Sequence, residues 1–132
     1  MSHVPIRMST LRGDQQIAFD TYVKISEKYI LYLRKGDSFE GKRLNRLKEK
    51  KLKKMFILEN DENSYRDYLN RNISMAYDQN SGKSIENRSE IIQGQQQAVA
   101  EEVMEDPGNE FAYQEAKQAV GMFVDFLVKE IS

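Results

Sequence analysis

The chain of 132 residues contains no cysteine, no tryptophan and a single histidine. The lack of cysteine excludes disulfides, thiolate metal sites and cysteine nucleophiles. His3 stands alone near the N-terminus, so we expect no histidine-based metal site, no catalytic triad and no bound cofactor. No stretch approaches 18 consecutive apolar residues, and the first residues lack the apolar run of a signal peptide. These absences exclude a transmembrane helix and most classes of enzyme, and we predict a cytoplasmic protein.

The charges are divided unevenly between the two halves of the chain. Residues 1–60 hold 14 Lys and Arg against 7 Asp and Glu, whereas residues 61–132 hold 6 against 14. Such an asymmetry indicates either two structural units or a charged partner for one of them. We interpret it as two units.

The first half shows the alternation of apolar and polar residues that is typical of β-strands. It is clearest over 19–25, and the run 29–34 is dense in β-formers. The polar residues 26–28 between these runs predict a hairpin with a three-residue link. Further strands are predicted over 4–8 and 54–58.

Two helices are predicted to complete this first unit. One spans about 39–50, with Ser38 as its N-cap and Leu44 and Leu47 on its apolar stripe. The other begins near residues 60–64. Its apolar face holds Tyr65, Tyr68, Leu69 and Ile73. The resulting order β-β-β-α-β-α describes a small mixed β-sheet head over 4–77.

From Ser84 onward the periodicity is helical. Asp106-Pro107-Gly108-Asn109 interrupts it, because proline lacks an amide donor and glycine favours a turn. The stripe of the first of these helices contains Ile85, Ile92, Val99 and Val103, widened by Ala98 and Met104. We therefore predict an α+β protein in which a linker, 78–83, joins the head to a C-terminal helical hairpin over 84–131. The sequence leaves open whether that linker is a flexible hinge or a tight turn.

The last helix is apolar around almost its whole circumference near its C-terminal end. A helix of that kind is normally buried on several sides, which indicates either a dimer or a following domain that covers it. The predicted self-association face consists of Val120, Phe123, Val124, Phe126, Leu127 and Ile131.

A strongly basic stretch over 42–54 holds eight cations and one acidic residue, Glu49. Its functional interpretation is a site for a nucleotide, a nucleic acid or an acidic partner. The alternative is a solvated helix face, since no aromatic residues interleave with the cations. The residues predicted to bind are Arg43, Arg46, Lys50 and Lys54.

Several stretches of the first unit together resemble a known segment of bacterial signalling proteins. They are Phe19-Asp20-Thr21-Tyr22-Val23, Tyr32-Leu33-Arg34-Lys35-Gly36-Asp37 and the lysine-rich run that ends at Met55-Phe56-Ile57. The pattern spans most of residues 4–75 and resembles the N-terminal accessory domain that precedes HD or HD-GYP phosphohydrolase domains.

The resemblance implies a regulatory module of cyclic-di-GMP signalling whose helices couple to an HD-type catalytic domain. The chain has neither a His-Asp pair nor a Gly-Tyr-Pro sequence, so we expect it to be catalytically inactive by itself. The expected partners are a protein or the HD-type domain, with a homodimer and a cyclic dinucleotide as further alternatives. A nucleotide- or nucleic-acid-binding protein that uses the basic stretch is the competing hypothesis.

Overall fold

The computed structural model describes residues 2–13, 15–50 and 52–131, apart from the side chain of Ile131. It confirms the α+β fold and divides the chain into two compact units, residues 1–72 and 73–132. This division falls within helix α2 (Glu62–Tyr77), whereas the sequence analysis places the end of the head at residue 77. The two units are therefore described one after the other.

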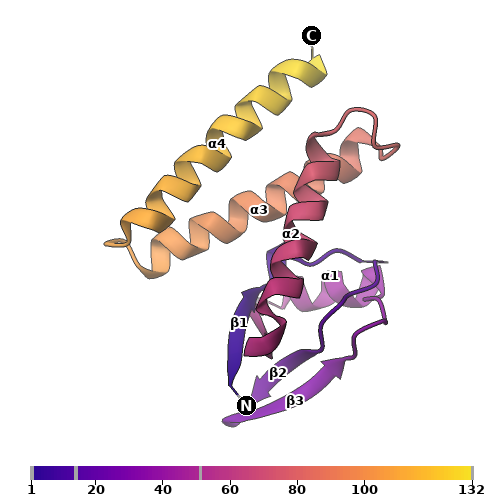
Figure 1. The fold of residues 1–132 in the computed structure, drawn as a ribbon, viewed down its shortest axis with the longest axis vertical. Coiled ribbons are helices and arrows are strands. Elements are labelled where there is room, and N and C mark those ends of the chain that lie inside the picture. The colour runs from indigo at the N-terminus through magenta and orange to yellow at the C-terminus, as the bar shows by residue number, and fades with distance from the viewer. Residues whose placement is uncertain (1, 14, 51, 132) are drawn as a thin grey trace. The chain divides into compact units, whose positions relative to one another are not determined.

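The first unit contains four strands and begins in the predicted order β-β-β-α-β-α (Figure 1). Its elements are β1 (His3–Arg7), β2 (Thr21–Ile25), β3 (Lys28–Leu33), α1 (Gly41–Glu49), β4 (Lys54–Leu58) and the first part of α2, with short 3-10 turns at Met8–Thr10 and Glu59–Asp61. The strands form one sheet in the order β1-β4-β2-β3, and each of its pairings is antiparallel. Pro5 therefore lies on an edge strand, where the missing amide donor is tolerated.

The hairpin between β2 and β3 is tighter than predicted. Its loop consists of Ser26 and Glu27 alone, and Lys28 already pairs with Ile25 as part of β3. Both loop residues have positive φ, 49° and 69°. Positive φ at both central residues gives a turn whose twist matches that of the strands, which explains the two-residue link.

Ser38 is not the N-cap of α1, contrary to the prediction. It forms an isolated antiparallel bridge with Gln16, and the Ile17 amide donates to the Asp37 carbonyl at 3.0 Å. These bonds hold the segment before the helix extended. The helix consequently begins at Gly41, with Glu40 as an N-cap that forms no side-chain capping bond.

The core of the first unit gathers side chains from the sheet, both helices and the long connection after β1. Phe19 is completely buried, and its ring meets Tyr65 and Tyr68 edge-to-face at centroid distances of 5.6 and 5.5 Å. The other buried members are Ile6, Met8, Leu11, Ile17, Phe39, Leu44, Met55 and Ile57. The predicted inward faces of α1 and α2 are thus confirmed at Leu44 and Tyr68.

The second unit is helical and comprises the end of α2 with α3 (Ile85–Glu105) and α4 (Glu110–Ile131). Figure 1 shows α3 and α4 side by side, joined by the short turn that the sequence predicts at 106–109. Ser84 caps α3, since its Oγ accepts a hydrogen bond from the Asn87 amide at 3.1 Å. The core contains Ala76, Ile91, Ile92 and Phe126.

Two members of the predicted α3 stripe are exposed. Ile85 is 45% exposed and Met104 is 77% exposed. Both lie in the terminal turns of α3, at its first residue and next to its last. The buried stripe of the helix runs instead through Arg88, Ile91, Ile92, Gly94 and Ala98.

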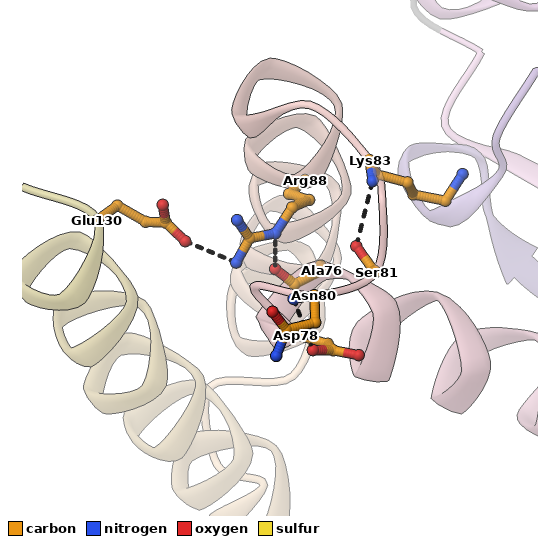
Figure 2. A network of polar contacts seen from close by, with 7 residues as sticks. All are labelled: Ala76, Asp78, Asn80, Ser81, Lys83, Arg88 and Glu130. Atoms are coloured by element: carbon orange, nitrogen blue, oxygen red, sulfur yellow. Dashed lines mark hydrogen bonds and ion pairs between the residues drawn. The ribbon is translucent and has the colours of Figure 1, made fainter.

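The predicted linker 78–83 forms a hydrogen-bonded turn (Figure 2). Asp78 Oδ1 accepts from the Asn80 amide at 2.8 Å, and the Asp78 carbonyl accepts from the Ser81 amide at 3.2 Å. Gly82 has a φ of +83°, a conformation that glycine adopts at no steric cost. The question between a hinge and a tight turn is therefore answered in favour of the turn.

Candidate interaction surfaces

Two of the four predicted binding cations, Arg43 and Arg46, lie on one face of α1, and a third, Lys50, is the C-cap of this helix. Arg43, Arg46 and Lys50 follow each other at spacings of three and four residues, and all three are exposed. Leu44 points the other way and is buried. Lys54 lies apart from them, at the start of β4, where it is half-buried and opposite Arg7 of β1. Lys51 of the same stretch lies outside the described residues.

Some of this positive charge has a structural explanation. Arg46 and Lys48 occupy the last turn of α1, where cations interact favourably with the negative end of the helix dipole. Lys48 Nζ also donates to the Leu11 carbonyl at 2.9 Å, which ties the helix to the connection after β1. The exposed face formed by Arg43, Arg46 and Lys50 is the part that could meet an anion.

Helix α4 carries two parallel seams of residues. The inner seam has alternating spacings of four and three residues, and its members are buried or half-buried against the rest of the second unit. It consists of Ala112, Ala116, Ala119, Phe123, Phe126 and Glu130. The outer seam is the same series displaced by one residue: Tyr113, Lys117, Val120, Val124, Leu127 and Ile131. Such spacing is that of helices that pack along a common seam.

Apart from Lys117, the outer seam is apolar, and four of its side chains are accessible. Tyr113, Val120, Val124 and Leu127 are between 42% and 54% exposed. It therefore contains Val120, Val124 and Leu127 of the predicted self-association face. The side chain of Ile131, the last predicted member, lies outside the described residues.

Phe126 and Phe123 do not belong to an exposed face, in contrast to the prediction. Phe126 is 4% exposed and meets Tyr77 edge-to-face at 5.9 Å, and Phe123 stacks on Phe126 at 6.3 Å. The two rings fill the space between the end of α2, α3 and α4. They stabilise the second unit from within, so the inner seam is not available to a partner.

A buried ion pair in the second unit was missed by the sequence analysis. Arg88 Nη2 lies 2.6 Å from Glu130 Oε1, and the two side chains are only 5% and 15% exposed. Both residues occupy the inward stripes of their helices. Two opposite charges at inward positions, one at the start of α3 and one at the end of α4, were the signal that could have revealed it.

A cluster of aromatic rings on the sheet contains one residue from each strand: His3 of β1, Tyr22 of β2, Tyr29 of β3 and Phe56 of β4. His3 stacks on Tyr29 at 4.0 Å and meets Tyr22 edge-to-face at 4.6 Å, while Phe56 meets Tyr29 at 5.2 Å. Lys24 Nζ lies 5.5 Å from the centre of the Tyr29 ring. These rings pack against each other, which accounts for several of the tyrosines as half-buried structural groups.

Among the described residues, no group of three or more His, Asp or Glu side chains could hold a metal ion. Over the same part of the chain, no helix is both long and apolar enough to cross a membrane.

Comparison with known proteins gives one informative relationship. No protein-family model matches the chain, and no curated protein matches it. A solved structure described as "Bd1817, a HDG"Y"P protein from Bdellovibrio bacteriovorus" is 58% identical, with a TM-score of 0.87. The match covers 97% of this chain but 42% of that one, so this chain spans less than half the length of its relative. Along nearly its whole length, the chain is thus similar to one part of a bacterial HD-GYP protein.

Proposed function

We propose that the chain is a non-catalytic regulatory module that couples a signal or a partner to an associated HD-type phosphodiesterase domain. The observation that carries this proposal is the 58% identity to less than half of an HD-GYP protein. A segment of that length leaves room for a separate catalytic domain in the relative. The single histidine, His3, is the reason for expecting no hydrolysis by this chain alone.

The outer seam of α4 is the surface best suited to such coupling. Its exposed members Val120, Val124 and Leu127 lie on the same helix as Phe126 and Glu130, which pack into the second unit. A partner that packed on the outer seam would therefore act on a helix whose other face holds the unit together. Displacing or rotating α4 would move both seams at once. Binding on the outer seam would therefore shift the equilibrium between two packing arrangements of the inner seam.

A chimera tests this proposal directly. This chain would replace the matching part of the Bdellovibrio protein, and hydrogen exchange of the α4 amides would be compared between the chimera and the isolated chain. We expect slower exchange around Val124 in the chimera, because an HD-type domain would cover the outer seam. Val124→Glu should abolish that protection by placing a charge in an apolar contact.

Gln118→Glu is the matched control, since Gln118 is also exposed on α4 but lies outside both seams. It should leave the protection intact. Equal exchange in the chimera and in the isolated chain would contradict coupling through α4. Hydrolysis of cyclic-di-GMP by the isolated chain would contradict the non-catalytic role.

The competing function, binding of a nucleotide or nucleic acid, is favoured by the exposed cations Arg43 and Arg46 on α1 and Lys50 at its C-cap. Isothermal titration with cyclic-di-GMP at two salt concentrations would test it. Binding through phosphates should weaken as salt rises, and Arg43→Glu with Arg46→Glu should abolish it. Arg66→Glu with Arg71→Glu, at two exposed positions of α2, makes the same charge change elsewhere. The α2 variant should bind as the wild type does. An affinity that does not change with salt, or that is the same in the Arg43→Glu with Arg46→Glu variant as in the wild type, would contradict this site.

A further inference from the structure

Strand β3 forms an edge of the sheet. It pairs with β2 on one side, and within the described part of the chain no strand pairs with its other side. The backbone groups that point outward from such an edge are a template for a further strand. Proteins usually protect an edge of this kind with a proline, a bulge or a charged residue in its middle.

The middle of β3 carries neither a proline nor a charged residue. Tyr29, Ile30, Leu31 and Tyr32 follow one another without a charge or a proline, and each is at least 36% exposed. The pairing of β2 with β3 is irregular between Thr21 and Tyr22, which lie opposite Leu33 and Leu31, so Tyr32 is an extra residue of β3 and the regular part of the outer edge is 28–31.

Both faces of this edge are apolar. Ile30 lies opposite Val23, which packs against the core, whereas Tyr29 and Leu31 point to the other face, beside the His3 and Phe56 rings. A strand added to β3 would therefore meet apolar side chains above and below the sheet. Successive residues of that strand should themselves be apolar, because cross-strand pairs stabilise a sheet through their side chains.

The charges stand at the two ends of the strand. Lys28 begins it, Arg34 and Lys35 follow it, and all three are exposed. Two nearby carboxylates already contact groups of this chain: Glu27 lies 3.5 Å from Lys24 Nζ, and Asp20 Oδ1 accepts from the Lys35 amide at 2.8 Å. A partner strand thus meets apolar side chains in the middle and cations at both ends.

We propose that β3 receives an extended peptide segment with an apolar centre and carboxylates at both ends, added as a further strand of the sheet. A second copy of this chain fits less well. An antiparallel pair of β3 strands would bring the Lys28 end of one copy beside the Arg34 end of the other, and like charges placed opposite each other destabilise a sheet. The proposal concerns the first unit and does not depend on coupling to an HD-type domain.

Binding of a labelled peptide to the full chain tests the proposal. The probe is Asp-Glu-Val-Tyr-Ile-Val-Glu-Asp, and the comparison peptide has lysine at each of its four acidic positions. We expect the acidic probe to bind at least about tenfold more tightly, a difference of about 1.4 kcal/mol, and to weaken as salt rises. Bound probe should also slow hydrogen exchange of alternate β3 amides, which is the signature of an added strand.

A charge swap provides the matched variants. Lys28→Glu with Arg34→Glu should reverse the preference, so that the lysine peptide binds more tightly than the acidic one. Arg66→Glu with Arg71→Glu makes the same charge change at two exposed positions of α2 and should leave the preference unchanged. The proposal is overturned if the two peptides bind alike, if the swap has no effect, or if β3 amides exchange at the same rate with and without probe. It is also overturned if the chain dimerises and Ile30→Lys makes it monomeric, since a second copy then occupies the edge.

Discussion

Arg88 and Glu130 join the first turn of α3 to the last turn of α4 through a buried ion pair of 2.6 Å (Figure 2). The same guanidinium donates from Nε to the Ala76 carbonyl at 2.8 Å. That carbonyl lies in the last turn of α2, where helix carbonyls lack partners within the helix. The guanidinium also lies over the Phe126 ring, at 5.2 Å from its centre. One side chain thus holds the ends of three helices together.

Glu130→Ala should destabilise the second unit by about 3 kcal/mol, because it leaves the charge of Arg88 buried without its partner. Urea unfolding followed by the helical circular dichroism signal would measure the loss. Glu90→Ala, at an exposed position of α3, is the control and should change stability by less than about 0.5 kcal/mol. Replacing both partners by apolar residues, as Arg88→Met with Glu130→Leu, should recover most of the loss. A Glu130→Ala variant as stable as Glu90→Ala would contradict a stabilising pair.

Tyr68 should make the first unit sensitive to alkaline pH. Burial raises the pKa of its hydroxyl, although the hydrogen bond from the Arg12 amide, at 2.8 Å, lowers it in part. A raised pKa means that the folded state favours the neutral phenol. The resulting stability is fully present below about pH 10 and is lost as the pH rises through the raised pKa.

Tyr68→Phe should therefore reduce the slope of stability against pH above about pH 10. At neutral pH the same variant should lose about 1 kcal/mol, because the Arg12 amide no longer has its acceptor. Free energies of unfolding between pH 7 and 11 would test both effects. Tyr113→Phe, at an exposed site on α4, should reproduce neither. An unchanged slope in Tyr68→Phe would show that this hydroxyl does not control alkaline stability.

Gly13 is required by a close approach of two backbone segments. A Cβ at this position would lie 2.7 Å from the Gly41 Cα, at the first residue of α1. Gly13→Ala should therefore cost about 1–3 kcal/mol, since neither backbone can move without shifting the helix. Gly121→Ala is the opposite case: its Cβ would meet nothing within 4 Å in the middle of α4, so it should stabilise by about 0.5–1 kcal/mol. Thermal melting of both variants would check the two signs.

The sequence was sufficient where local patterns determine the structure. Alternation located β2, and the helical periodicity from Ser84 onward located α3. It could not give the insertion of β4 between β1 and β2, because periodicity within a strand contains no information about its partners. Ser38 illustrates the same limit, since a bridge to Gln16 outweighs its capping propensity. Phe126 illustrates this limit for the candidate site, because hydrophobicity alone did not show which apolar residues of α4 lie in the inner seam and which in the outer seam.

The outer seam of α4 should make the isolated chain self-associate. Val120, Val124 and Leu127 are exposed to similar degrees, and their spacing suits packing against a second helix. Analytical ultracentrifugation at about 100 μM, well above the dissociation constant of a micromolar interface, should detect a dimer. Val120→Glu with Val124→Glu should make the chain monomeric, because two buried carboxylates on each copy would have no partner.

Phe126→Ala separates this interface from the stability of the second unit. It empties space among Ala76, Ile91 and Ile92, so it should lower the free energy of unfolding by about 3–5 kcal/mol. The outer seam itself would be unchanged, so any remaining folded protein should still associate. A monomeric wild type at about 100 μM would contradict self-association through this seam. An HD-type domain would then be the remaining proposed partner of the outer seam, and the chimera experiment would test whether it covers that seam.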